Sequence, residues 1–242
     1  MTYCVGLLLD TGLVMASDSR TNAGVDHVAT FPKMNLFTVP GERVLVLLTS
    51  GNLAISQAVI NRLQKDIAEN TGPNLLSAQC MFEAARIVGD AVRAVHHDDA
   101  EHLRKHQADF NQSILLGGQI AGEKTRLFNI YAAGNFIEAC PETPYFQIGE
   151  TKYGKPILDR VVDSRTDLRA AAKCTLISFD STIRSNLSVG MPIDLIIYRA
   201  DSFSADCKRR VTDKDPYFNL IRKSWSDGLK RVFSELPDPD WI

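Results

Sequence analysis

Neither sign of charge dominates this sequence, and long hydrophobic runs are missing from it. Lys and Arg total 27 against 29 Asp and Glu, so the formal net charge is only −2 over 242 residues. Such a balance supplies no broad positive field for nucleic acid or for an anionic membrane. The longest apolar runs, such as residues 44–48, are far too short to cross a bilayer. We therefore expect neither a nucleic-acid partner nor a membrane partner.

Cysteine is scarce and scattered. The chain has five cysteines, an odd number, and no two of them form a CxxC pair. Disulfide frameworks and zinc sites need even counts or close spacing, so we interpret these residues as reduced thiols. Residues 1–5 show neither the basic segment nor the apolar segment of a secretory signal. These observations predict a cytoplasmic location and point to no cofactor.

The remaining composition is that of an ordinary globular chain. Hydrophobic residues make up 45% and charged residues 23%, which is enough apolar material for a sizeable core. Linkers, repeats and low-complexity tracts are lacking, and the length suits one large domain. We therefore expect a single domain over residues 1–242.

Apolar periodicity predicts how the chain is organised. Strands are expected over residues 3–9, 13–16, 43–49, 113–119, 125–131, 135–139, 145–148 and 193–199. Helices are expected over residues 53–70, 74–106, 156–162, 168–183 and 217–236. Strands and helices come in separate blocks, which is typical of a layered α+β fold with helices packed outside antiparallel sheets.

Thr2 carries the chemistry that stands out most in this chain. It follows Met1 directly, and trimming of that methionine would leave it as the first residue. An N-terminal Thr holds a hydroxyl nucleophile and an α-amine on adjacent carbons. The reference pKa of that amine is near 8, so it can act as the base that activates the hydroxyl. Thr2 alone is also compatible with an incidental N-terminal residue that has no chemical role.

The neighbouring segments add the groups that such a nucleophile needs. Asp18 follows the second predicted strand, where a hairpin returns the chain toward Thr2. Lys33 lies in an apolar segment, and a buried lysine held charged by a carboxylate would lower the pKa of the Thr2 hydroxyl. Gly51 stands between a strand and a helix, where outward N–H groups suit an oxyanion hole and equally suit a plain helix cap.

These residues together resemble the proteasome β-subunit pattern. The resemblance is carried by Thr2, Gly12, the segment 15–20 (Met-Ala-Ser-Asp-Ser-Arg) and the segment 33–36 (Lys-Met-Asn-Leu). Asp18 lies 16 residues after Thr2, as in that family. Lys33 lies 31 after Thr2, one fewer than usual, which implies a one-residue deletion between Arg20 and Lys33.

Among the branches of that family, the sequence is most similar to the bacterial ancestral β-subunits, called Anbu. The stretch 178–198 and a long C-terminal segment from about residue 200 favour this branch. The resemblance implies an N-terminal nucleophile hydrolase with a four-layer αββα sandwich. It also implies a self-assembled homo-oligomer, either a ring or one turn of an open helix.

The resemblance implies a role for several further residues. Thr2 would be the nucleophile, Asp18 and Lys33 the electrostatic pair, and Gly51 the oxyanion-hole donor. The substrate pocket would be lined by Arg20, Thr21, Thr49 and Leu53.

Active proteasome subunits carry a further Ser, Asp and Ser around the threonine amine. This chain has Gly149-Glu150-Thr151 where Gly-Ser-Gly is expected. Asp180 could supply the expected acid. The number of residues before the last predicted strand, 193–199, instead puts Ser185 or Asn186 nearer to the position of that acid in the family.

One further cluster suggests a metal, but weakly. It consists of His96, His97, Asp98, Asp99, Glu101, His102 and His106. His102 and His106 are four apart and could share a helix face, yet the HExxH pattern is absent and a charge run at a helix end is usually solvated. We therefore predict no metal site.

The leading functional hypothesis is a threonine-type amide hydrolase that acts on peptide or unfolded protein. Two alternatives stay open: a non-peptide amidase of the same superfamily, and an assembly scaffold of the same fold that is catalytically weak or inactive. The sequence identifies no unfoldase partner and no natural substrate.

Overall fold

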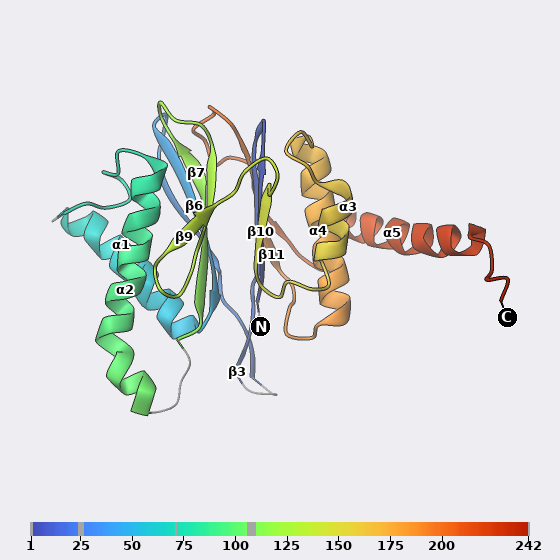
Figure 1. Cartoon of the computed structure of the whole chain (residues 1–242), viewed down its shortest axis with the longest axis horizontal. Coiled ribbons are helices and arrows are strands. Elements are labelled where there is room, and N and C mark those ends of the chain that lie inside the picture. The colour runs from blue at the N-terminus through green and yellow to red at the C-terminus, as the bar shows by residue number, and fades with distance from the viewer. Residues whose placement is uncertain (1, 24–26, 71, 106–109, 242) are drawn as a thin grey trace.

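The computed structural model of this chain describes residues 2–23, 27–70, 72–105 and 110–241. Two antiparallel sheets face one another at its centre (Figure 1). The first sheet has the strand order β10-β1-β2-β11-β12. These strands are β1 (Tyr3–Leu9), β2 (Gly12–Asp18), β10 (Tyr145–Gly149), β11 (Ile193–Arg199) and β12 (Lys208–Val211). Because β1 and β2 lie inside this sheet, each of them pairs with a strand on both sides.

The second sheet follows the chain order. Its strands are β5 (Met34–Val39), β6 (Arg43–Gly51), β7 (Gln112–Ile120), β8 (Arg126–Ile130) and β9 (Phe136–Glu138). A separate hairpin of β3 (Arg20–Ala23) and β4 (His27–Thr30) connects the two sheets and extends from the lower end of the molecule in Figure 1. The sequence patterns did not indicate β3, β4, β5 or β12, which are short or lie at sheet edges.

Two pairs of helices cover the outer faces of the sheets. The helices are α1 (Leu53–Glu69), α2 (Met81–Lys105), α3 (Lys155–Val161), α4 (Leu168–Ser185) and α5 (Pro216–Glu235). Helices α1 and α2 pack on the second sheet, and α4 packs on the first sheet with α3 beside it. The mixed α+β class predicted from the blocks of strands and helices is therefore confirmed.

Three apolar clusters hold these elements together. One lies between α1, α2 and the second sheet, and includes Leu47, Val88 and Leu116. Another lies between the first sheet and α4, and includes Tyr3 and Phe179. The third fills the space between the two sheets, where β1, β2, β6 and β7 meet. Both faces of β1, β2 and β6 are consequently buried, which explains their nearly continuous apolar runs.

The predicted helix over residues 74–106 is wrong at its start, because α2 begins at Met81. Residues 74–80 form a capped turn instead. The Asn74 side-chain oxygen accepts hydrogen bonds from the N–H groups of Leu76 and Ser77, which is the local competition by which Asn disfavours a helix interior. His106, at the predicted end of that helix, lies outside the described residues.

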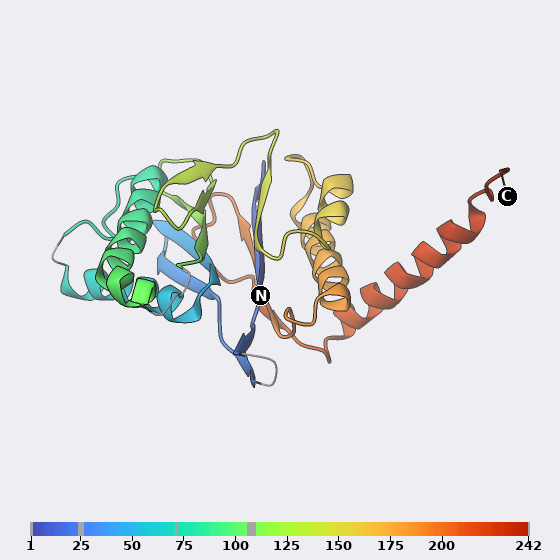
Figure 2. The same cartoon turned by 60° about the horizontal axis from the view of Figure 1, so that its bottom comes forward.

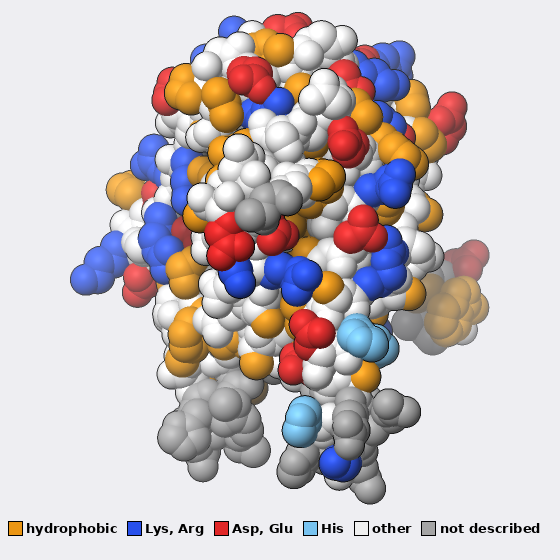
Figure 3. Space-filling model, turned by 90° about the vertical axis from the view of Figure 1, so that its left-hand side faces the viewer, with side chains coloured by type: hydrophobic (Ala, Val, Ile, Leu, Met, Phe, Trp, Pro, Cys, Tyr) orange, Lys and Arg blue, Asp and Glu red, His pale blue; other side chains and the backbone are white. Residues whose placement is uncertain are grey.

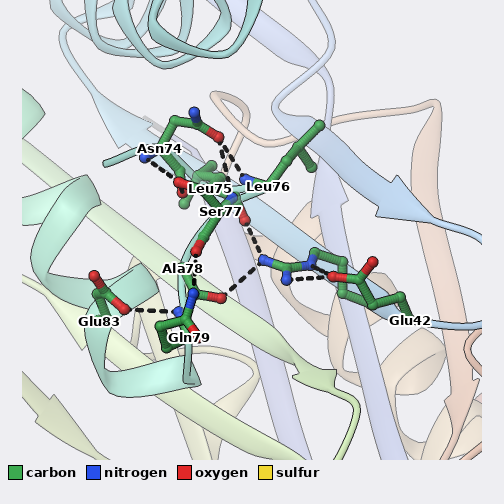
Figure 4. A network of polar contacts seen from close by, with 9 residues as sticks. Glu42, Asn74, Leu75, Leu76, Ser77, Ala78, Gln79 and Glu83 are labelled. Carbon is green, nitrogen blue, oxygen red and sulfur yellow. Dashed lines mark hydrogen bonds and ion pairs between the residues drawn. The ribbon is translucent and has the colours of Figure 1, made fainter. Parts of the chain in front are cut away.

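Arg43 links this turn to β6 of the second sheet. Its Nη1 donates to the carbonyl oxygens of Leu75 and Ala78, each at 3.0 Å, and its Nη2 pairs with the Glu42 carboxylate (Figure 4). The guanidinium is almost fully buried at the start of β6. It therefore satisfies two buried carbonyl groups that the irregular turn leaves without a helical partner.

The face formed by α1 and α2 carries acidic and basic side chains intermingled with single apolar ones (Figure 3). The two signs of charge are thus mixed on this face, as the near-zero net charge of the whole chain would suggest. In the described part of the chain, no helix is both long and apolar enough to span a membrane.

We expect Arg43→Met to lower the free energy of unfolding by about 2–3 kcal/mol, because two buried carbonyl groups lose a charged donor. Urea unfolding followed by circular dichroism at fixed protein concentration measures this change. The matched control is Arg165→Met, whose side chain is 82% exposed and which we expect to change stability by less than about 0.5 kcal/mol. Equal effects of the two substitutions would contradict the role given to Arg43.

Candidate active site

Asp18 is the centre of the candidate site. It ends β2 and is fully buried. Its Oδ1 accepts from the Tyr3 N–H at 3.0 Å and from Lys33 Nζ at 2.7 Å, and its Oδ2 accepts from the Gly190 N–H at 3.3 Å. One carboxylate thus ties together β1, the segment before β5 and the loop before β11.

Burial has a direct electrostatic consequence for this carboxylate. It raises the pKa of Asp18 above the ordinary value, while the charge and hydrogen bond of Lys33 and the two backbone donors oppose the rise. Burial and the surrounding donors thus act on the charge of Asp18 in opposite directions, and the pair with Lys33 offsets part of the cost of burial.

Lys33 is held as tightly as its partner. Its side chain is buried, and its ammonium donates to Asp18 and to the Arg20 carbonyl oxygen at 2.6 Å. The Thr49 N–H donates to the Lys33 carbonyl oxygen at 3.0 Å, which holds the backbone of Lys33 beside β6. The ammonium is desolvated by this setting but not left unpaired, as a buried charge requires.

Thr2 lies at the start of β1, immediately before the residue whose N–H bonds Asp18. It is buried, and its carbonyl oxygen accepts from the Glu150 N–H at 2.6 Å. Gly149, opposite Tyr3, has φ +83°, and a Cβ there would clash with the Thr2 carbonyl and approach Ser50 Oγ. A glycine is therefore needed to let the β10 backbone close on Thr2.

Gly51, the expected oxyanion-hole donor, is the last residue of β6. It has φ +112°, and a Cβ there would clash with the Asn111 carbonyl oxygen. Asn52 follows as the N-cap of α1, and its side chain accepts from the Ala54 N–H at 3.0 Å. The Asn52 side chain therefore satisfies one of the free N–H groups in the first turn of α1. Gly51 lies immediately before this N-cap.

The expected pocket residues lie on three elements: Arg20 and Thr21 on β3, Thr49 on β6 and Leu53 on α1. Arg20 Nη1 donates to the Leu187 carbonyl oxygen at 2.8 Å, and its guanidinium lies against Gly190. Thr49 is buried in β6, and Leu53 begins α1 half-buried. Thr21 Oγ1 is buried with no hydrogen-bond partner in the described structure.

The three residues suggested as partners of the Thr2 amine, Asp180, Ser185 and Asn186, do not share a contact in the described part of the chain. Asp180, on α4, pairs with Arg222 of α5 at 2.6 Å, and Ser185 is exposed at the end of α4. Asn186 Nδ2 donates to Glu150 Oε2 at 2.7 Å. Of the three, Asn186 is thus the one linked to Thr2, through Glu150.

Glu150 and Gly190 are site residues that the sequence analysis did not assign. Glu150 is buried, and its Oε1 also accepts from the Lys152 N–H at 2.7 Å. The only sequence signal for it was a carboxylate in a turn where the family pattern has serine. Gly190 had no signal, because its N–H reaches Asp18 from 172 residues away.

The acidic and histidine-rich end of α2 remains apart from these residues. His96 packs edge-on against Phe110, with ring centroids 4.5 Å apart. Among the described residues, no three His, Cys, Asp or Glu side chains gather in a way that could hold a metal ion. Cys4 lies near the site, where its Sγ donates to the Thr49 carbonyl oxygen at 3.6 Å, and burial raises the pKa of its thiol.

Two facing antiparallel sheets, with a threonine just before one inner strand and a buried Asp–Lys pair bonded to the N–H of the next residue, are typical of a proteasome-like β-subunit fold. Solved structures bear this out over the whole chain. Anbu from Yersinia bercovieri is 52% identical with a TM-score of 0.94, and the match covers 99% of this chain and 100% of that one. The chain belongs to the Anbu family of ancestral β-subunits, which confirms the resemblance found in its sequence.

Other Anbu structures agree with this assignment. The helical assembly of the Anbu complex from Pseudomonas aeruginosa is 51% identical with a TM-score of 0.95, covering 99% of this chain and 98% of that one. Anbu from Hyphomicrobium sp. strain MC1 is 51% identical with a TM-score of 0.90, covering 98% and 99%. No model of a protein family and no curated protein matches the chain.

We expect Asp18→Asn and Lys33→Met each to lower the free energy of unfolding by about 3–5 kcal/mol, because each leaves its buried partner uncompensated. The double substitution removes both charges and should cost clearly less than the sum of the single changes. Chemical unfolding of the four proteins at one concentration measures this coupling.

The control for this cycle is the exposed pair of Lys155 and Asp159, whose atoms are 2.8 Å apart on α3. Lys155→Met and Asp159→Asn should each cost less than about 1 kcal/mol. Additive losses at Asp18 and Lys33 would contradict a tightly coupled pair.

Proposed function

We propose that this chain is a threonine-type N-terminal nucleophile hydrolase that cleaves amide bonds, peptide bonds in particular, as one subunit of a self-assembled multimer. The observation that carries the proposal is the buried pair of Asp18 and Lys33, whose carboxylate is bonded to the N–H of the residue after Thr2. A charged pair costs free energy to bury, and its place behind a candidate nucleophile suits an electrostatic role.

The reaction would begin once Met1 has been removed. The free amine of Thr2 takes the proton of its own hydroxyl as Oγ attacks the carbonyl carbon of the substrate. The positive charge of Lys33 favours the alkoxide form of Oγ, and Asp18 keeps that lysine charged and in place. The Gly51 N–H would donate to the oxyanion that forms on the substrate oxygen.

The reaction then proceeds in two steps, acylation of Thr2 and hydrolysis of the acyl ester. The Thr2 ammonium returns its proton to the leaving amine as the C–N bond breaks, which leaves an acyl ester on Oγ. Water attacks that ester, gives one proton back to Oγ through the same amine, and releases the carboxylic acid. Arg20, Thr21, Thr49 and Leu53 would line the pocket that receives the substrate side chain.

We also infer that the chain forms the four-layer αββα sandwich of this superfamily as a single domain. The support is the packing of α1 and α2 on the second sheet and of α4 on the first, with an apolar cluster between the sheets. In this arrangement the site lies at one end of the sheets, where β1 begins and β2 ends. An inward-facing site in a multimer would confine peptide hydrolysis to unfolded segments that can enter.

A second candidate is a scaffold of the same fold with weak or no catalysis. The surroundings of the amine favour it: Asp180 is paired with Arg222, and Glu150 replaces the expected serine. An amine without well-placed partners would act poorly as a base, since such sites depend on preorganisation.

Labelling of untagged protein with a threonine-directed β-lactone separates the two candidates. We expect an intact mass that lacks Met1 and carries one adduct, and we expect Thr2→Ala to abolish the adduct without changing the assembly. The matched control is Thr11→Ala, which removes an exposed threonine from the β1–β2 turn and should label fully. A chain that retains Met1, or is trimmed but unlabelled, would refute the hydrolase and favour the scaffold.

A further inference from the structure

Tyr3, the residue after Thr2, carries a buried hydroxyl group to which the proposed reaction gives no role. Its side chain is fully buried, and its ring packs on Phe179 of α4 with the ring centroids 4.5 Å apart. A phenylalanine would fill this core position without burying a polar group, and a buried polar group costs free energy unless it is hydrogen-bonded. The contacts of the hydroxyl therefore indicate what it contributes.

Three hydrogen bonds form a directed chain through this hydroxyl. The Gln147 side-chain amide donates to Tyr3 Oη at 2.8 Å, and Ser178 Oγ donates to the Gly154 carbonyl oxygen at 3.0 Å. Because Ser178 has a single hydroxyl proton, Tyr3 is the donor in the bond of 2.6 Å between the two hydroxyl groups. Burial raises the pKa of Tyr3 above its ordinary value, so the donated proton stays in place at neutral pH.

The two ends of this chain of hydrogen bonds belong to one short segment, residues 147–154. Gln147 lies on β10, opposite Val5 of β1, and Gly154 is the residue before α3. In Figure 2 the segment is drawn in yellow, where the chain crosses from β10 beside β1 to the helices α3 and α4. Tyr3 therefore holds the segment at both of its ends.

Close packing at Gly154 shows how tightly one of these ends is held. A Cβ there would lie 2.2 Å from Ser178 Oγ, 2.7 Å from Tyr3 Oη and 2.9 Å from Thr182 Oγ1. Ser178 and Thr182 are one turn apart on α4, and both are fully buried. A residue without a side chain is therefore needed for the backbone before α3 to approach these three hydroxyl groups.

The middle of the same segment holds Thr2. The Glu150 N–H donates to the Thr2 carbonyl oxygen at 2.6 Å, and the Gly149 backbone lies against that carbonyl. Tyr3 also reaches the other part of the candidate site, because its N–H donates to Asp18. Tyr3 is thus bonded through its hydroxyl to the segment that holds Thr2, and through its N–H to the carboxylate of the buried ion pair.

We propose that Tyr3 is a positioning residue for the Thr2 nucleophile. Its hydroxyl fixes the segment 147–154, and that segment fixes the backbone of Thr2, so the hydroxyl controls the orientation of Thr2 without touching the substrate. This inference rests on the proposed function, because it assigns a further residue to the same site. A fully satisfied chain of buried hydrogen bonds makes its surroundings rigid, and a nucleophile depends on such preorganisation.

Tyr3→Phe tests the proposal in the full chain, because it removes the hydroxyl and keeps the ring. The measurement is the rate at which the threonine-directed β-lactone labels Thr2, followed over a series of lactone concentrations. We expect the maximal rate to fall at least about 10-fold, while the lactone concentration that gives half of this rate changes less than about 2-fold. Ser178→Ala breaks the same chain at its next bond and should reproduce this split, and circular dichroism verifies that both variants are folded.

The matched control is Tyr198→Phe. Tyr198 is also almost fully buried, and its hydroxyl donates to Gln119 Oε1 at 2.7 Å, but it pairs with Leu13 at the opposite end of β2 from Asp18. Loss of a buried hydrogen bond lowers stability in both variants, so we expect Tyr198→Phe to be labelled within about 2-fold of the wild-type rate. Equal losses of labelling in the two variants, or a Tyr3→Phe protein labelled at the wild-type rate, would overturn the proposal.

Hydrogen exchange at the Glu150 amide keeps the positioning role separate from the proposed hydrolase. We expect Tyr3→Phe to speed the exchange of this amide at least about 10-fold, because the segment opens more often, and Tyr198→Phe to leave it unchanged. A wild type that the lactone does not label would refute the hydrolase alone, and faster exchange in Tyr3→Phe would still support the hold of Tyr3 on Thr2. Labelling of the wild type, with neither labelling nor exchange altered in Tyr3→Phe, would refute the positioning role alone.

Discussion

The contact on which the rest of this structure depends is the buried carboxylate of Asp18. It accepts hydrogen bonds from Tyr3, Lys33 and Gly190, which belong to three segments that are distant in the sequence. A carboxylate without water must find such donors, because the free energy of desolvation is otherwise not recovered. The same requirement that holds β1, β2 and the segment before β5 together also links Lys33, through Asp18, to the residue after Thr2. The ion pair of Asp18 and Lys33 therefore serves both the stability of the fold and the proposed chemistry.

Close backbone approach is the second constraint at the site. Gly149 and Gly51 both have positive φ, and in each case a Cβ would clash with a carbonyl oxygen. The backbone of β10 can therefore lie against Thr2, while the end of β6 turns into α1. Glu150 follows from this geometry, since its N–H holds the Thr2 carbonyl and its carboxylate is held by Asn186. This carboxylate stands in the turn where the proteasome pattern has a serine, and it is the observation that favours the scaffold over the peptidase.

Helix α5 is anchored on α4, the helix that covers the sheet containing β1 and β2. Arg222 pairs with Asp180, so an acid that the sequence suggested for the amine is engaged in anchoring α5 instead. The outer half of the helix then carries an apolar face away from the body.

The sequence by itself determined the class of fold, the family and the principal candidates for the site. Those signals are local: alternating or helical periodicity for β1, β6, α1 and α4, and a spaced motif for Thr2, Asp18 and Lys33. The pattern failed at residues 74–80, where Asn74 competes for the backbone donors and Arg43 holds the turn from another strand. Short edge strands such as β12 were also not predicted from the sequence, because so few residues show little alternation of polar and apolar side chains.

Only the tertiary structure decided which groups meet. Gly190 and Asp18, or Asn186 and Glu150, come together through pairing of distant strands and loops, and no local pattern encodes a contact of that kind. The tertiary structure likewise gives Asp180 and Asn186, which are six residues apart in the sequence, different partners, Arg222 and Glu150. The physical reason is that periodicity records which face of an element is buried, whereas the partner of a buried polar group depends on how the sheets and helices pack.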